Sequence, residues 1–245
     1  MKKKLIPKTI KIQSLKSNQV DEMFKLFEIF YENVSFDRFK VDLSAKTKVI
    51  ILLDKEKKIQ GFSTFYDFDF FHHKKDIRVL FSGDTIIAPD YWGTSALTME
   101  FLKNMILLKL KYPFRPVWWF LISKGYKTYL LLANNFLEYY PRFDRGTPGE
   151  HQELIASLSE KFYPGKFNSH TGVIEFEANE HEHLKESIAP ITNELMEKYP
   201  KIKFFNFQNP GWRKGDELAC IGEVDPLLGV IHPFKILKKL LKINK

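Results

Sequence analysis

The stretch "IIAPDYWGTSALTMEFL", residues 86–102, joins a strand, a tight turn and the start of a helix. Its β-branched residues favour a strand, and Pro89 ends that strand because proline cannot donate to the ladder. From Thr94 onward apolar residues recur at helical spacing, and Thr94 or Ser95 can cap the helix start. This connection is either an ordinary strand-to-helix turn or a cradle for a phosphate-bearing group at a helix N-terminus.

Alternating and helical patterns continue on both sides of this stretch. Before it, we expect a strand over 9–15, an amphipathic helix over 20–34, a hairpin over 48–68 and a long strand over 77–89. After the helix that it opens, we expect a strand over 116–122, a short helix ending near 135, a helix from about 152, a strand over 172–178, a helix over 183–199 and a hairpin over 202–224. Helices and strands that alternate in this way, with hairpins among them, predict a mixed α/β fold with a mixed sheet.

Composition limits the class of protein. The chain has 245 residues, 44% of them hydrophobic, which suffices for a packed core. A single cysteine excludes an intramolecular disulfide framework and favours a reducing cytoplasm. No apolar run approaches the roughly 18 residues of a membrane span, so we expect neither a signal peptide nor a transmembrane helix.

The net charge of +8 favours anionic partners such as phosphates, nucleic acid or acidic lipids. Most of the cations are lysines, whereas arginine is the better bidentate partner of bases and phosphates. The charge therefore does not indicate sequence-specific nucleic-acid binding.

The element order, together with the residues from Ile87 to Gly93, resembles the GNAT-type N-acyltransferase superfamily. In that superfamily a strand ends in a Val-x-Pro-like sequence, and a basic, glycine-rich turn then opens a helix. The second half of the turn departs from the pattern, because Trp92 stands where Arg or Gln is usual and Ser95 and Leu97 stand where glycines are usual. The resemblance implies a GNAT-like mixed central sheet flanked by helices, with residues 9–144 as the core of a single domain, 145–232 as an elaboration and 233–245 as a basic amphipathic helix.

The resemblance also implies an activity. An acyl group would pass from a thioester carrier, acetyl-CoA, a longer acyl-CoA or acyl carrier protein, to an amine by direct attack, without a metal. The amine would be a small molecule or a lipid precursor. The residues that match the family's carrier-binding positions are Ile86, Ile87, Ala88, Trp92, Gly93, Thr94, Ser95, Ala96 and Ser123.

Acid and base roles follow from the same resemblance. Asp84 shares a strand face with Ile86 and is the candidate general base, although it can equally be a solvated or capping carboxylate. Tyr129 is the candidate acid near the sulfur, although Tyr126 and Tyr129 at helical spacing are also typical of a packed face.

Other reactive side chains give weaker signals. Neither the pair His72 and His73 nor the pair His181 and His183 has partners at zinc spacing, so we expect no metal. Cys220 alternates with apolar neighbours and fits a small buried residue.

Three alternatives stay open, of which nucleic-acid binding rests only on the charge and the interleaved aromatic residues. The altered turn is compatible with a non-catalytic GNAT-like ligand-binding protein. The lysine-rich segment "FKILKKLLK" is compatible with a peripheral membrane protein, or with a terminal helix docked on the domain.

Overall fold

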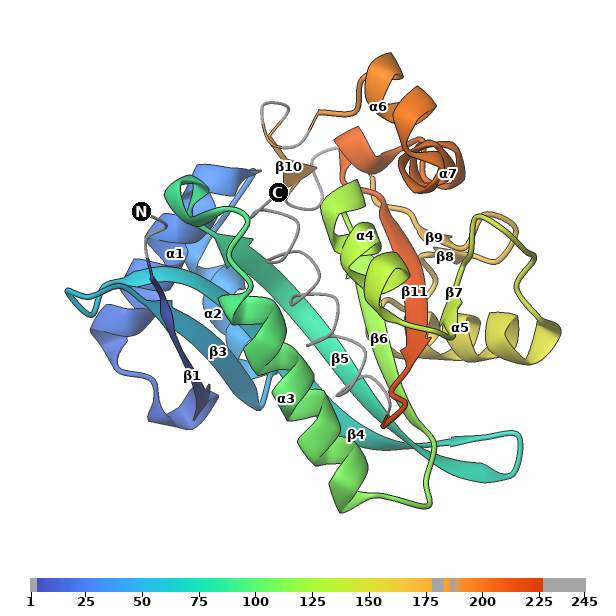
Figure 1. The fold of residues 1–245 in the computed structure, drawn as a ribbon, viewed down its shortest axis with the longest axis horizontal. Helices are drawn as coiled ribbons and strands as arrows, with labels where there is room; N and C mark the ends of the chain where they lie inside the picture. The colour runs from blue at the N-terminus through green and yellow to red at the C-terminus, as the bar shows by residue number, and fades with distance from the viewer. Residues whose placement is uncertain (1–3, 178–182, 186–187, 189, 227–245) are drawn as a thin grey trace, which may run out of the picture.

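A computed structural model describes residues 4–177, 183–185, 188 and 190–226. This part of the chain contains a nine-stranded sheet in the order β1-β3-β4-β5-β6-β11-β9-β8, with β7 paired to β11 (Figure 1). The strands are β1 (Ile6–Lys11), β3 (Lys48–Leu53), β4 (Ile59–His72), β5 (Lys75–Ile87), β6 (Val117–Ser123), β7 (Tyr139–Tyr140), β8 (Phe167–Asn168), β9 (Val173–Ile174) and β11 (Glu217–Glu223). Because β5 and β6 are parallel and the other pairs are antiparallel, the sheet is mixed, as predicted.

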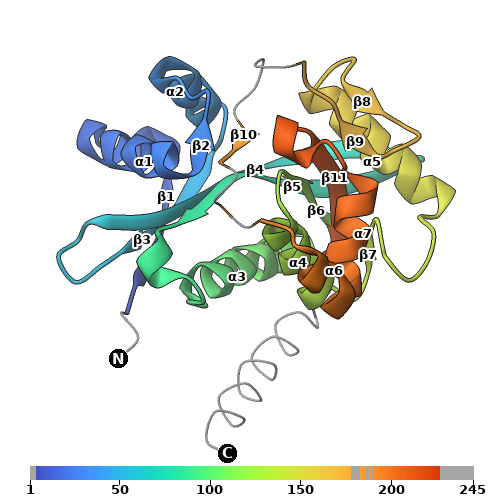
Figure 2. The same cartoon turned by 90° about the horizontal axis from the view of Figure 1, so that it is seen from above.

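Helices cover both faces of the sheet. Figure 2 shows α1 (Ser17–Phe30), α2 (Phe36–Ser44) and α5 (Gly149–Phe162) on one side and α3 (Ala96–Lys111) and α4 (Tyr126–Asn135) on the other. Successive side chains of β6 point to opposite faces of the sheet. Trp118 packs in a hydrophobic cluster with residues of α5, and Trp119 packs in a hydrophobic cluster with residues of α3 and α4. Both tryptophans are therefore core residues.

The parallel pair β5 and β6 separates along its length. The two strands pair from Arg78 with Val117 to Ser82 with Leu121. Beyond that point β5 continues beside β4, and β6 continues beside β11. The sheet therefore contains a wedge-shaped gap between two neighbouring strands.

A bulge lies where the gap begins. Ser63 of β4 faces Thr85 and Phe65 faces Ser82, so Thr64 stands opposite both Gly83 and Asp84. An extra residue of this kind bends its strand and increases the local twist. The bulge thus supplies a physical reason for β5 to turn away from β6.

Two predicted elements near the C-terminal part of the chain are wrong. Residues 202–207 were expected to be a strand of the 202–224 hairpin, but they belong to helix α7 (Pro200–Gln208). Proline fits the first helical position, and Ile202 and Phe205, three residues apart, are both buried while Phe207 is 82% exposed. The strand β11 pairs instead with β6, β7 and β9.

The helix expected over 183–199 is also wrong. Its described residues form β10 (His183–Leu184), which pairs with β2 (Tyr31–Glu32), and a short helix α6 (Asn193–Lys198). Thr192 caps α6 by accepting the backbone N–H of Leu195, so the helix starts after Pro190 instead of running through it.

The remaining expected elements that lie among the described residues are present, with shifted ends, and α2 is an additional helix. The basic amphipathic segment 233–245 and His181 lie outside the described residues. Within the described part of the chain, none of the helices has the length and apolar content needed to cross a bilayer.

Gly61 provides a test of the contact between β4 and β5. A Cβ atom at this position would lie 2.8 Å from the backbone oxygen of Ile86, closer than real side chains approach. We expect Gly61→Ala to lower the free energy of unfolding by about 1–3 kcal/mol, as overpacking usually does. Urea denaturation measures the loss.

Gly146→Ala is the matched control, because a Cβ atom there meets nothing within 4 Å. We expect its stability to stay within about 0.5 kcal/mol of the wild type. Equal stability of the two variants would contradict the close strand contact at Gly61.

Candidate functional site

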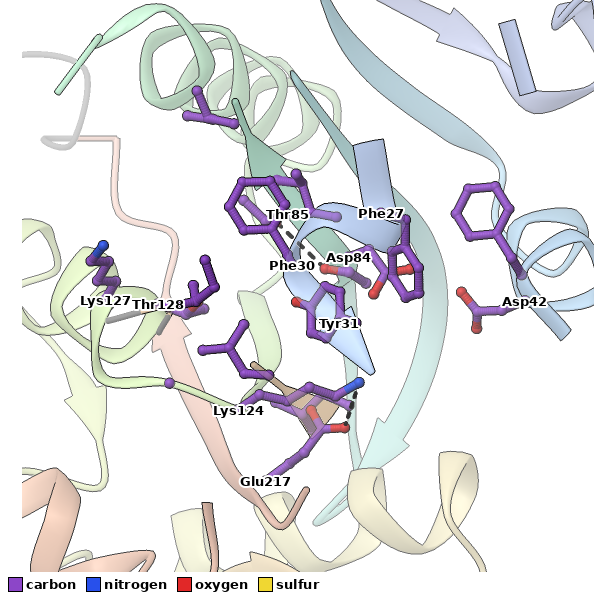
Figure 3. A pocket seen from close by; sticks show the side chains of 18 of the residues that line it. Phe27, Phe30, Tyr31, Asp42, Asp84, Thr85, Lys124, Lys127, Thr128 and Glu217 are labelled. Carbon is purple, nitrogen blue, oxygen red and sulfur yellow. Dashed lines mark hydrogen bonds and ion pairs between the residues drawn. The ribbon is translucent and has the colours of Figure 1, made fainter. Parts of the chain in front are cut away.

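A cavity of about 570 Å³ occupies the gap between β5 and β6. Its walls come from β5, the connection between β6 and α4, the helices α1 and α2, and single residues of more distant segments (Figure 3). The lining residues are Phe27, Phe30, Tyr31, Val34, Ser35, Arg38, Phe39, Asp42, Lys46, Phe81, Gly83, Asp84, Thr85, Ile86, Ile87, Trp92, Gly93, Leu97, Thr98, Ile122, Lys124, Gly125, Lys127, Thr128, Leu131, Tyr163, Leu184, Ile188 and Glu217. Aromatic side chains thus combine with acids and bases around a space of substrate size.

The edge of β5 presents backbone groups to this space. Ala88 donates its N–H to Gln60 of β4, and every second residue of an antiparallel strand faces the other way. Ile87 therefore turns its N–H and C=O away from β4, and its oxygen accepts a 2.8 Å hydrogen bond from Trp92 Nε1. Beyond Ser82 this edge of β5 is no longer paired with β6, so a bound molecule can reach the backbone N–H of Ile87 there.

The turn between β5 and α3 differs from the expected cradle. Gly93 has φ +80° and open space where a side chain would stand. Thr94 donates its N–H to Tyr91 at 3.2 Å, and the N–H of Ala96 reaches Thr94 Oγ1 at 3.3 Å. The backbone N–H groups of Thr94 and Ala96, two of the predicted carrier-binding residues, are thus hydrogen-bonded within the turn.

Of the predicted carrier-binding residues, Ile86, Ile87, Trp92 and Gly93 line the cavity. Those that do not line it are Ala88, Thr94, Ser95, Ala96 and Ser123. Ser123 is buried, and its hydroxyl donates to the carbonyl of Gly125 at 2.9 Å. The first turn of α3 contributes Leu97 and Thr98 instead.

Trp92 spans the outer end of the cavity. The ammonium of Lys127, on α4, lies 3.8 Å from the centroid of the Trp92 ring. The centroids of the Trp92 and Phe30 rings are 6.4 Å apart. Burial lowers the pKa of Lys127. Trp92 and Lys127 thus form a cation–π pair. The two residues are far apart in the sequence, and both line the cavity.

Tryptophan fluorescence can report on this end of the cavity. Trp92 is 48% exposed, whereas Trp118, Trp119 and Trp212 are at most 8% exposed. We expect acrylamide to quench chiefly the emission of Trp92, and Trp92→Phe to remove most of the quenchable fraction. Quenching that is equally strong in Trp92→Phe would contradict this placement.

The inner end of the cavity holds a cluster of charged and phenolic groups. Lys124 Nζ lies 3.7 Å from Glu217 Oε1, and the two side chains are 11% and 2% exposed. The same ammonium lies 5.1 Å from the centroid of the Tyr31 ring, which stacks on Phe27. In Figure 3 the ring of Tyr31 lies between Asp84 and Lys124. A carboxylate, a phenol and an ammonium therefore face one space from three different elements.

A second buried cation flanks this end. Lys46 Nζ lies 2.6 Å from Asp42 Oδ1 and 5.5 Å from the centroid of the Phe81 ring. Its side chain packs against Gly83, where a Cβ atom would lie 2.8 Å from Lys46 Cε. Any larger residue at Gly83 would therefore displace Lys46 from the cavity wall.

The two predicted catalytic residues are not brought together. Asp84 lines the cavity. Tyr129 is fully buried, donates its hydroxyl to the carbonyl of Pro141 at 3.2 Å and packs against Phe204 and Phe205. Burial raises the pKa of Tyr129, which is the opposite of what a proton donor near neutral pH requires.

Sequence reasoning missed Tyr31 and Glu217, and it placed Lys124 only at the end of a strand, beside Ser123. Tyr31 was assigned to the face of a helix that in fact ends at Phe30. An available signal was Asn33, because asparagine adopts positive φ more readily than most residues, and here its φ is 55°. Lys124 and Glu217 are remote in sequence, and nothing in the local pattern indicates that they meet.

Candidate metal ligands and the thiol can be placed within the described residues. Among them, no group of three or more His, Cys, Asp and Glu side chains is placed to hold a metal ion. Cys220 is fully buried in the core, and burial raises the pKa of its thiol.

Comparisons with known proteins give matches to solved structures only. No family model matches the chain, and no curated protein matches it. A probable N-acyltransferase of unknown function from Enterococcus faecalis V583 is 18% identical, with a TM-score of 0.38 over 52% of this chain and 31% of its own. The GNAT family N-acetyltransferase YhbS from Escherichia coli, solved with CoA, is 13% identical, with a TM-score of 0.37 over 50% of this chain and 64% of its own. An acetyltransferase from Trypanosoma brucei is 14% identical, with a TM-score of 0.37 over 59% of this chain and 98% of its own. The chain is thus similar to solved N-acetyltransferases, at low identity, and spans less than two thirds of the first two.

Proposed function

We propose that this protein transfers an acyl group from a thioester carrier, either acyl-CoA or acyl carrier protein, to an amine. The cavity between the separated ends of β5 and β6 carries this proposal. A gap in a sheet gives an extended arm access to strand backbone that a continuous sheet would cover. In this gap the arm would lie along Thr85 to Ile87.

The reaction requires a donor to the thioester carbonyl oxygen, a base for the amine and a proton source for the sulfur. The amine nitrogen attacks the carbonyl carbon, the C–S bond breaks, and the nitrogen loses a proton while the sulfur gains one. The N–H of Ile87 would polarise the carbonyl oxygen, as a backbone donor does at an oxyanion. Asp84 would take the proton from the amine.

The two ends of the cavity suit different parts of the substrates. Lys127 and the open backbone at Gly93 lie at the outer end, where the phosphate of a carrier arm would find a cation. Phe27 and Phe30 of α1 and Phe39 of α2 line a further wall, which would bury an apolar acyl chain or the apolar body of an amine.

Native mass spectrometry of the purified chain tests which donor it holds, because a co-purified carrier adds a defined mass. The activity test measures thiol release from acetyl-, octanoyl- and palmitoyl-CoA, and from the corresponding acyl carrier proteins, with an amino acid, a polyamine and an aromatic amine. Thiol release that depends on the amine supports the proposal. No bound carrier and no amine-dependent thiol release would overturn it.

A blocked cavity supplies the matched comparison. Thr128 lines the cavity from α4, whereas Ser157 is exposed on α5. We expect Thr128→Trp to abolish the thermal stabilisation by acyl-CoA and Ser157→Trp to retain it. Equal stabilisation of both variants would place the carrier elsewhere on the protein.

A further inference from the structure

Tyr31 is held at the cavity by contacts on three sides. Its N–H donates to Phe27 at the end of α1, and its ring stacks on the Phe27 ring at a centroid distance of 4.5 Å. The strand pairing between β2 and β10 places Leu184 opposite Tyr31. Only 9% of the residue is exposed, although it lines the cavity. Its phenol therefore has little freedom to leave the site.

A buried ammonium lies beside the ring of Tyr31. The ammonium of Lys124 lies 5.1 Å from the ring centroid, so a negative charge that forms on the phenol during proton transfer has a cation beside it. Glu217, 2% exposed and 3.7 Å away, holds Lys124 in place. The other charged or titratable groups facing this end of the cavity or paired beside Tyr31 are Arg38, Asp42, Lys46, Asp84, Tyr163, Glu32 and His183.

Acyl transfer also needs a group that donates a proton to the leaving sulfur. Asp84 cannot be this group while it takes the proton from the amine. We infer that Tyr31 is this donor and that Lys124 and Glu217 position it; the inference rests on the proposed acyl transfer. In the step, the new N–C bond forms, the C–S bond breaks, Asp84 takes a proton from nitrogen, and Tyr31 gives its phenolic proton to the leaving sulfur. A proton then passes from Asp84 to the phenolate through solvent, which restores both groups.

Two other phenols are the rivals. Tyr129 was the sequence-based candidate, but its hydroxyl donates to Pro141 outside the cavity. Tyr163 lines the cavity from the end of α5 and packs edge-on against Phe176. Replacing each tyrosine by phenylalanine removes one hydroxyl and leaves the ring, so the three variants can be compared directly.

The experiment measures amine-dependent thiol release with the acyl-CoA and amine that the wild type turns over fastest. We expect Tyr31→Phe to lower kcat by about 10²-fold, at the low end of the range for general acids because a thiolate is a stable leaving group. The dissociation constant of acyl-CoA should stay within about twofold of the wild type. Tyr66→Phe, on β4 outside the cavity, is the control with wild-type turnover.

A pH profile separates a proton donor from a structural residue. With 3,5-difluorotyrosine at position 31, whose phenol is the stronger acid, the alkaline limb of kcat/KM should move to lower pH. An unchanged limb, wild-type turnover by Tyr31→Phe, or a larger loss in Tyr129→Phe or Tyr163→Phe would overturn the assignment alone. Absence of turnover in the wild type would overturn the acyl-transfer proposal together with it.

Discussion

We expect the replacement of Asp84 with asparagine to lower the turnover number of the proposed acyl transfer by about 10²- to 10⁴-fold, the usual contribution of a general base. The amide keeps the size of the side chain and loses the ability to take a proton from the amine. Asp84 stands at the bulge of β5 and lines the cavity, so its side chain reaches the space where the amine would attack. Thiol release under saturating substrates measures the loss.

Asp90→Asn is the control for this variant. Asp90 is exposed in the turn after β5 and does not line the cavity, so turnover should match the wild type. The acid limb of kcat/KM should also disappear in Asp84→Asn and persist in Asp90→Asn, because only the first removes the proposed base. Wild-type turnover by Asp84→Asn would show that another group takes the proton.

Phe62→Ala has the largest effect that we expect on stability. Phe62 is fully buried on β4 and meets the ring of Phe39 edge-on at a centroid distance of 6.2 Å. It belongs to the cluster that holds α1 and α2 on the sheet. Removing a buried aromatic ring costs about 3–5 kcal/mol, because the surrounding side chains fill the cavity only in part. Urea denaturation measures the change.

The same variant should weaken acyl-CoA binding, since Phe39 is both a partner of Phe62 and a wall of the cavity. Phe114→Ala is the control, because Phe114 is 98% exposed and its loss should stay within about 0.5 kcal/mol of the wild type. A loss below about 1 kcal/mol in Phe62→Ala would mean that the helices can close over the missing ring.

The sequence predicted the strand, turn and helix around Pro89 because three local signals coincide there. The β-branched pair before the proline, the proline itself and the helical spacing after it each act within a few residues. Asp84 could be placed on β5 for the same reason. These features depend on neighbours in the chain, so tertiary packing did not change them.

The errors arose where tertiary contacts decide. Residues 202–207 are rich in phenylalanine and read as a strand, but Phe205 packs against Tyr129 of α4, and the segment is a helix. Tyr31 continues the helical spacing of α1, and the strand pair with β10, formed by residues far along the chain, places it outside the helix. Lys124 and Glu217 likewise come together only because β6 and β11, which are far apart in the sequence, pair in the sheet.

The bulge opposite Thr64 makes this site depend on a residue count as much as on side-chain identity. Deleting Gly83 would leave every apolar side chain of the core in the chain, yet it would restore one-to-one pairing between β4 and β5. Asp84 would then take the place opposite Thr64, and β5 would lose the bend that draws it away from β6. We therefore expect a chain shorter by this one glycine to pair β5 with β6 over a longer stretch and to lose the part of the cavity that lies between the two strands.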